Sequence, residues 1–572
     1  MGSKIGVNGD TKSNLTLNPV SIWWVCWAGI WTVAVALGMA YLVIHRSSTP
    51  LRIRGLGLSL SAVVLLHLYW ISVQLELLLG TLAPGDAEFW VMGTLLPCGI
   101  ALFHASNSRF IHVANLQKKY ARHSSRHVGL PSGNVNFSSK IKGGLIRRFR
   151  RLDYTTRSLI AVGIAMLVQI FLTVLMYIIS RKWHSSWGIP GTELHGTAME
   201  QKVEMGRGWE WWPGVFWQFL WSWIVAPFVL WKSRAIHDTQ GWRVQTIGCA
   251  IASFHATPLW LIALYVPSMA TVNKYWLPPQ WICLSITFLE IFTVFLPCWE
   301  VVRHQSLRQE TLDLIAEWES RTRSDGADLK SLKSVTATVK STIAGSAKTD
   351  FSVESVFAMP ALEYALDHDP TPLQQFSALH DFSGENIAFL TSVAQWKKTF
   401  ERAIAIEDKD QIQETLHERF NSALFIYAEF ISAHAEFPIN LGFQDFTRLE
   451  SIFERPARMI YGDEPEINPI APFDTSSFSR LPSAMSSEGS EKTIRVTPSL
   501  QDCVRYWGEI PEGFIACGLG ANIFDDAVKA VKYLVLTNTW PKFVKSRSAV
   551  SHSMSTFGSG LDIKLAHKQA VK

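Results

Sequence analysis

The chain has 572 residues, of which 48% are hydrophobic and only 18% are charged, and its 53 basic and 48 acidic residues leave a net charge of +5. Soluble proteins carry about 25% charged residues, so the composition argues against a wholly soluble chain. The net charge is too small for this length to indicate nucleic-acid binding, and the collagenous, coiled-coil, mostly disordered and disulfide-rich classes are also excluded.

The seven cysteines show no pattern of a metal or redox site. None stands in a Cys-x-x-Cys pair, and none has a histidine partner at the spacing of a zinc site. Most of them lie inside apolar runs, where a cysteine usually serves as a small core residue. We therefore expect no metal, no cofactor and no disulfide framework.

Seven segments are apolar and long enough to cross the hydrocarbon core of a membrane, which takes about 20 helical residues. They are Ile22–Ile44, Leu56–Leu79, Phe89–Ser106, Leu159–Ile179, Trp211–Trp231, Val244–Val266 and Gln280–Trp299. The sequence therefore predicts a seven-helix transmembrane domain over residues 21–302, preceded by a polar extracellular stretch over residues 1–20.

Basic residues are concentrated in one set of loops. The connection 107–158 carries twelve Lys and Arg residues against the single acid Asp153, and the first and fifth connections are also basic. Because cytosolic loops carry the excess of Lys and Arg, the N-terminus is predicted to lie outside and the C-terminus inside. Asn14, in the sequon Asn-Leu-Thr, is then a predicted glycosylation site. The basic loop binds anionic membrane lipid or the protein partner considered below, or it is a solvated face at the membrane surface.

Glu290 lies within the last predicted span, where a carboxylate is costly and usually functional. Two interpretations stay open: a protonated or hydrogen-bonded packing residue, and a role in ligand sensing or switching. An odd number of spans with an outer N-terminus is receptor topology, so a small-molecule ligand of this domain is also left open. The Asp-Arg-Tyr and Asn-Pro-x-x-Tyr motifs of rhodopsin-type receptors are missing.

After the last span, apolar residues recur at helical spacing between charged ones, which predicts an amphipathic helix. These residues are Leu307, Thr311, Leu314, Ile315 and Trp318. The helix either lies on the membrane surface or packs on the next domain. Residues 320–350 are rich in Ser, Thr, Lys and Gly, so residues 303–350 are predicted to form a juxtamembrane helix and a linker.

From residue 351 the pattern becomes that of a soluble helical domain. Apolar stripes at helical spacing run along Phe420–Ile431 and Ile523–Leu534, and no alternating strand pattern of useful length is present. We therefore predict an all-α fold: the transmembrane bundle and then an all-helical domain over residues 351–546. A Ser- and Pro-rich insertion at residues 462–500 interrupts that domain, and the polar tail 547–572 is predicted to be disordered.

Three blocks of the helical domain resemble the regulator of G-protein signalling (RGS) domain. The first comprises Met359–Glu363 (MPALE) and Phe382–Leu390 (FSGENIAFL), and the second comprises Ile426–Ile431 (IYAEFI) followed by Asn440. The third runs from Phe524 to Phe543 and contains FDDA and WPKF. With seven preceding spans, this layout is similar to that of fungal and plant seven-helix RGS proteins, which implies a plasma-membrane location.

The resemblance implies a partner and a mechanism. RGS domains accelerate GTP hydrolysis by heterotrimeric Gα subunits, which already carry the catalytic Arg and Gln. The activator holds the switch loops of Gα in place, so the resemblance implies no active site of its own. It also implies three sets of Gα contacts: Glu385 and Asn386 on the switch loops, Asn440 near the catalytic Gln, and Leu534, Asn538, Thr539 and Lys542 as the third cluster.

Two of these residues depart from the family pattern, which usually has Asp at the position of Asn538 and Arg at that of Lys542. Loss of the carboxylate and of the forked Arg contact predicts weaker activity, or activity restricted to one Gα. Two other interpretations stay open: a seven-span receptor or scaffold that binds Gα without activating it, and a transporter with an appended docking domain.

Overall fold

The computed structural model describes most of the chain. The described residues are 17–79, 86–121, 154–184, 187–196, 201, 204–324, 356–401, 409–435, 437–461, 506, 508–516 and 520–569. The predicted glycosylation site Asn14, most of the linker and the insertion 462–500 lie outside them. Their regular structure is helical, apart from one isolated bridge between Ser180 and Ile189, which confirms the all-α prediction.

Seven helical segments of the described chain are long and apolar enough to cross a membrane, as the sequence predicted. The protein is therefore an integral multi-pass membrane protein. The spans are formed by α1 (Pro19–Ile44), α3 (Leu56–Leu79), α4 (Ala87–Ala121), α6 (Tyr154–Ile179), η2–α8–η3–α9 (Trp209–Trp211, Trp212–Phe219, Leu220–Val225 and Ala226–Ser233), α10–α11 (Trp242–Phe254 and Ala256–Tyr265) and α12–η6–α13 (Gln280–Glu290, Ile291–Phe295 and Leu296–Ser324). Three short helices, α2 (Thr49–Arg52), η4 (Pro267–Ala270) and η5 (Val272–Lys274), lie between spans.

Two of the helices continue well beyond the predicted spans. The third span was expected to end at Ser106, whereas α4 continues to Ala121. The last span continues through α13 to Ser324, so the predicted amphipathic helix is the second half of α13 rather than a separate element. Neither extension contains a proline, and elongating an existing helix adds one hydrogen bond per residue without a new nucleation step.

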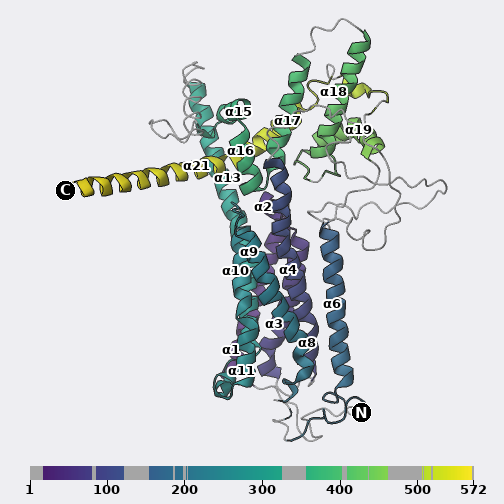
Figure 1. The fold of residues 1–572 in the computed structure, drawn as a ribbon, viewed down its shortest axis with the longest axis vertical. Helices are drawn as coiled ribbons and strands as arrows, with labels where there is room; N and C mark the ends of the chain where they lie inside the picture. The colour runs from purple at the N-terminus through teal and green to yellow at the C-terminus, as the bar shows by residue number, and fades with distance from the viewer. Residues whose placement is uncertain are drawn as a thin grey trace, which may run out of the picture. The chain divides into compact units, whose positions relative to one another are not determined.

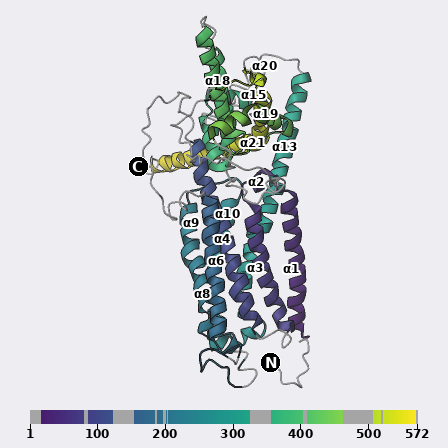
Figure 2. The ribbon, with the colours of Figure 1, turned by 90° about the vertical axis from the view of Figure 1, so that its right-hand side faces the viewer.

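The chain divides into two compact units, and the boundary falls inside these two helices. Among the described residues, the first unit comprises those of 17–113 and 154–302, and the second comprises those of 114–121 and 303–569. The second unit thus contains the last turns of α4, from Ala114 onward, as well as the predicted helical domain. Figures 1 and 2 show the spans of the first unit as long helices whose axes are roughly aligned.

Glycines allow some of the spans to approach each other closely. A Cβ atom at Gly38 of α1 would lie 2.6 Å from Val294 Cγ1, and a Cβ atom at Gly248 of α10 would lie 2.5 Å from the ring of Phe292. Small residues let helix backbones approach each other where no hydrophobic effect drives association in lipid. Both glycines therefore pack α1 and α10 against the π-helical turn η6.

The second unit is built from helices around an aromatic core. Its helices are α15 (Met359–His368), α16 (Thr371–Phe376), the π-turn η8 (Ser377–Asp381), α17 (Gly384–Glu401), α18 (Lys409–Phe430), α19 (Phe443–Tyr461), α20 (Glu512–Ala516) and α21 (Asp525–Gln569). Phe453 of α19 is fully buried, and its ring centroid lies 5.4 Å from that of Tyr427, 5.7 Å from that of Phe420 and 5.8 Å from that of Phe524. The apolar stripes that predicted α18 and α21 thus meet in one core.

The C-terminal tail differs from the sequence-based expectation. Residues 547–572 were predicted to be disordered, whereas α21 continues as a helix to Gln569 (Figure 1). No proline follows Pro541 in this helix, although Gly558 and Gly560 each weaken a helix interior by about 1 kcal/mol. The packed first half of α21 supplies the nucleus from which the remaining turns extend.

The amphipathic helix α19 allows a matched test of the core. We expect Phe453→Ala to destabilise the second unit by about 3–5 kcal/mol, because it opens a cavity beside the rings of Phe420, Tyr427 and Phe524. Phe443→Ala on the same helix removes a side chain that is 83% exposed, and the expected change is within about 0.5 kcal/mol. Thermal unfolding of the detergent-solubilised chain measures both, and equal effects of the two variants would contradict this core.

Candidate functional site

The first unit contains a buried polar cluster centred on Glu290, at the junction of α12 and the π-turn η6. Glu290 is 1% exposed, and its Oε1 lies 2.7 Å from Nδ1 of His67 on α3. Its Oε2 accepts a hydrogen bond of 2.5 Å from the indole Nε1 of Trp31 on α1. Nε2 of His67 in turn lies 3.1 Å from Oγ1 of Thr32. The cluster therefore connects three spans through one carboxylate.

This geometry bears on the two interpretations of Glu290. Both carboxylate oxygens have partners, which is the arrangement that a buried carboxylate needs in an apolar environment. Glu290 is thus a hydrogen-bonded residue that holds α1, α3 and α12 together. A role in ligand sensing stays a prediction. The π-turn that follows it is a feature often found at functional sites in helices.

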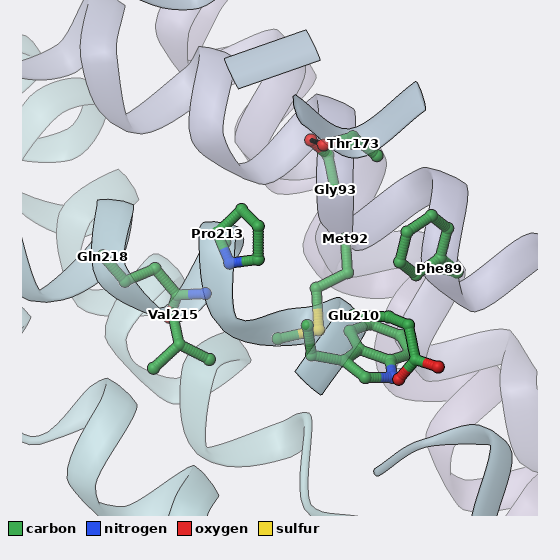
Figure 3. Close-up of a pocket in the computed structure, with 10 residues that line it drawn as sticks. Phe89, Met92, Gly93, Thr173, Glu210, Pro213, Val215 and Gln218 are labelled. Carbon is green, nitrogen blue, oxygen red and sulfur yellow. Dashed lines mark hydrogen bonds between the residues drawn. The ribbon is translucent and has the colours of Figure 1, made fainter. Parts of the chain in front are cut away.

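Two small cavities lie between the spans, and Gln218 of α8 lines both. The first, about 10 Å³, lies between Phe89 and Met92 of α4, Thr173 of α6, and Pro213 and Val215 of α8 (Figure 3). The second, about 30 Å³, extends to His104 and to Leu289, next to Glu290. Ligand sites for drug-sized molecules measure about 300–1,000 Å³, so these cavities have room for one or two waters only.

The first cavity is bordered by a buried ion pair. Glu210 is 3% exposed, and its Oε2 lies 2.9 Å from Nζ of Lys182, while its Oε1 accepts a hydrogen bond from Ser180. Nζ of Lys182 also donates to the carbonyl of Arg207. Both charges are therefore compensated, and the pair joins the end of α6 to the start of the next span.

In the second unit, a sharp turn positions the first block of the RGS-like pattern. The π-turn η8 ends at Phe382, which has a left-handed backbone (φ 52°), a conformation that no other non-glycine residue of the described chain adopts. This backbone costs roughly 1–2 kcal/mol, and the burial of the Phe382 side chain compensates for it. The turn reverses the chain, so that α17 begins at Gly384 with Glu385 and Asn386 in its first turn.

Asp381 connects this turn to the last block. Its side chain is 1% exposed, and Oδ1 lies 2.6 Å from Nζ of Lys542. Oδ2 accepts hydrogen bonds of 2.9 Å from the hydroxyls of Ser383 and Thr539. Two predicted contact residues, Thr539 and Lys542, are therefore engaged within the chain. Burial raises the pKa of Asp381, but the Lys542 ammonium and the two hydroxyls outweigh burial, and the net pKa lies below its ordinary value.

The other predicted contact residues differ in exposure. Asn440 is exposed, in a loop held by the hydrogen bond from the Ile439 amide to the Phe430 carbonyl. Leu534 is half-buried, and Asn538 is buried, with no hydrogen-bond partner at its side-chain oxygen among the described residues. Glu385 and Asn386 are also buried, at 5% and 7% exposure.

The burial of Glu385 comes from the end of α4. The Gln117 amide donates to Oε2 of Glu385 at 3.0 Å and accepts from the Gly384 backbone amide at 3.1 Å. The Tyr120 carbonyl accepts a hydrogen bond from Gln374, and a Cβ atom at Gly384 would lie 2.9 Å from Cβ of Tyr120. The ring of Tyr120 also packs 6.3 Å from Phe430 and 5.9 Å from Phe437, in the segment that leads to Asn440. The first and second blocks therefore meet near Tyr120, and Asp381 joins the third block to the first.

Sequence reasoning missed Asp381, Gln117 and Tyr120 as residues of this site. Asp381 stands one residue before the recognised FSGEN block, but its partner Lys542 lies 161 residues further along the chain. Gln117 lies in a predicted basic loop, 268 residues before Glu385. A local pattern carries no signal for contacts at such separations, and only the adjacency of Asp381 to the block could have drawn attention to it.

No protein-family model matches the chain, and no curated protein or solved structure matches it either.

The Glu290 cluster predicts a specific effect on the stability of the first unit. Glu290→Ala removes the acceptor of both His67 and Trp31, and we expect it to cost about 1–3 kcal/mol. Glu290→Gln should retain most of this stability, because an amide can accept from Trp31 and donate to an unprotonated Nδ1 of His67. A thiol-reactive dye that reports exposure of the buried Cys249 and Cys283 during heating measures both variants. An unchanged midpoint for Glu290→Ala would contradict the cluster.

Asp381 predicts a pH dependence of the second unit. Because its folded-state pKa lies below the ordinary value of 3.8, the stabilisation is complete above that value and is lost as pH falls through the lower folded-state pKa. At neutral pH we expect Asp381→Asn to cost about 3–5 kcal/mol, because it leaves the Lys542 charge without its partner. Calorimetric unfolding of both proteins from neutral to acid pH measures the difference, which should shrink at low pH. A constant difference would contradict the assignment.

Proposed function

We propose that this membrane protein regulates heterotrimeric G-protein signalling. In this proposal the second unit binds a Gα subunit, accelerates its GTP hydrolysis and so attenuates the signal. The protein acts at the plasma membrane with the second unit on the cytosolic side, where Gα resides. It supplies no nucleophile, metal or general base of its own, because the Gα subunit carries the catalytic groups.

The observation that carries the proposal is the convergence of the three RGS-like blocks. Asp381 joins the first block to Thr539 and Lys542 of the third, and Tyr120 contacts both the first block and the segment that leads to Asn440 of the second. These blocks are far apart in the sequence. Their convergence at one place is what a shared binding face requires, and it supports treating them as one site rather than as unrelated matches.

The mechanism follows from what this face offers chemically. Asn440 is exposed and free to reach a partner, and an amide can both donate to and accept from the backbone of a mobile loop. Holding the switch loops of Gα in their transition-state arrangement accelerates hydrolysis through positioning alone. Asn440 would contact the loop that carries the catalytic Gln, and Glu385 and Asn386 would contact the other switch loops.

Lys542 has a different role from the one that its motif position suggests. Its ammonium pairs with the buried Asp381 at 2.6 Å, so it orders the turn before Glu385. Lysine presents a compact charge, whereas arginine could hold a carboxylate and still reach outward with its other nitrogens. This difference supports the expectation of weaker or more selective activity toward Gα subunits.

One observation favours a second candidate function, that of a scaffold that binds Gα without activating it. Asn538 stands where the resembling family usually has Asp, and its buried side-chain oxygen has no hydrogen-bond partner among the described residues. An amide accepts hydrogen bonds from backbone N–H groups more weakly than a carboxylate does. In this alternative Gα binds, but its switch loops are not held tightly enough to accelerate hydrolysis.

The two functions predict different outcomes in one assay. The full-length chain in lipid nanodiscs is added in excess to a panel of GTP-loaded Gα subunits, and single-turnover hydrolysis is followed. We expect acceleration on at least one Gα, and Asn440→Ala should reduce the rate by about tenfold, which corresponds to about 1.4 kcal/mol of transition-state stabilisation. Asn538→Asp should leave the rate equal or raise it.

The outcomes separate the candidates clearly. Binding of Gα without acceleration, with acceleration appearing only in Asn538→Asp, would favour the scaffold. A rate unaffected by Asn440→Ala would show that another surface is responsible. Absence of both binding and acceleration on every Gα, in the wild-type chain and in Asn538→Asp, would overturn both functions.

A further inference from the structure

The end of α4 covers the face that the proposed function assigns to Gα, and this inference rests on that function. We propose that residues Ala114–Ala121, here called the blocking segment, keep the chain in an inactive state. Gα and the blocking segment would compete for the first turn of α17, so Gα binds only when the segment moves away.

The blocking segment makes complementary hydrogen bonds with the first turn of α17. Gln117 is fully buried, and its one amide group both donates to the Glu385 carboxylate at 3.0 Å and accepts from the Gly384 N–H at 3.1 Å. A carboxylate and a backbone N–H are the kinds of group that a partner protein would otherwise engage there. The segment therefore engages both an acceptor, the Glu385 carboxylate, and a donor, the Gly384 N–H, in the first turn of α17.

Aromatic packing and an ion pair complete the contact. Tyr120 is 1% exposed and lies between the rings of Phe430 and Phe437, so it also stands against the segment that leads to Asn440. Nζ of Lys119 lies 2.7 Å from Oε1 of Glu429 on α18. Both side chains of this pair are partly exposed, so salt, nearby charges or covalent modification of either side chain can weaken the ion pair.

The contact is built to be reversible. Its polar part consists of a few hydrogen bonds and one partly exposed ion pair, and the buried Asn386 side-chain oxygen has no partner among the described residues. A buried polar atom without a partner makes the closed state less favourable and leaves Asn386 able to gain a hydrogen bond elsewhere.

Neighbouring lysines provide a matched test. Lys119 pairs with Glu429, whereas Lys118 donates to Asn115 on the same helix and is exposed. In full-length chain in nanodiscs with GTP-loaded Gα, we expect Lys119→Glu to raise the single-turnover rate by about two- to fivefold, as loss of a partly exposed ion pair implies. Lys118→Glu, which makes the same change of charge, should leave the rate unchanged. The charge swap Lys119→Glu with Glu429→Lys should return it to the wild-type value.

A second variant tests the buried part of the contact. Gln117→Leu keeps the size of the side chain but removes both hydrogen bonds, and we expect a rate increase of about tenfold. Hydrogen exchange of the peptide that contains Gly384 and Glu385 should be slow in the wild-type chain and in Lys118→Glu, and faster in Lys119→Glu and Gln117→Leu. This measurement needs no Gα, and slow exchange elsewhere in the second unit shows that each variant is folded.

The possible results distinguish failure of the inference from failure of the proposed function. Equal acceleration by the wild-type chain and by all variants, sensitive to Asn440→Ala, would overturn the blocking segment and leave the proposed function standing. Equal stimulation by Lys118→Glu and Lys119→Glu would assign the effect to membrane-surface charge and would also overturn the inference. No acceleration of any Gα by any variant, despite faster exchange at Gly384, would overturn the proposed function and, with it, the inference.

Discussion

The second unit depends on one buried carboxylate. Taking the Asp381 side chain out of water costs several kcal/mol, and this cost is offset only because Lys542, Thr539 and Ser383 satisfy both of its oxygens. Since two of these partners lie on α21, the carboxylate determines where the first turn of α17 rests against that helix. This interaction therefore contributes to the positions of Glu385 and Asn386 relative to α21.

The first unit uses the same physical device in a different environment. Hydrocarbon offers no water to satisfy a carboxylate, so Glu290 persists only because His67 and Trp31 reach it from two other spans. Gly38 lets α1 approach the π-turn that follows the carboxylate. In both units, therefore, a buried acid orders elements that are distant in the sequence, and the surrounding apolar packing supplies most of the stability.

The proposed Gα face and the blocking segment form one system. A segment attached to the same chain acts at a high effective concentration, so a modest contact of the Gln117 and Lys119 type is enough to keep the face covered. A partner that binds only the uncovered face must offset the free energy of opening. Its apparent affinity is therefore its intrinsic affinity multiplied by the fraction of chains in which the face is uncovered. Any influence that weakens the contact thus strengthens Gα binding to the same extent, without a change in the face itself.

The seven spans and the all-α character could be determined from the sequence. An apolar run of about 20 residues in hydrocarbon has to satisfy its own backbone, which only a helix does within one segment, and stripes such as Phe420 and Tyr427 show the helical period directly. The sequence also drew attention to Glu290, because a carboxylate in a span is conspicuous. It predicted a helix after the last span, but it did not predict that this helix is continuous with the span or that α4 extends to Ala121.

Only the tertiary structure decided which side chains meet. Asp381 pairs with a lysine 161 residues away, and Gln117 meets Glu385 across 268 residues. The resemblance assigned Glu385 to a contact with Gα, whereas in the structure the end of α4 buries it. Helix formation depends on neighbours three and four residues apart, so a sequence displays it locally, but these pairings depend on the path of the whole chain and on the shapes that it brings together.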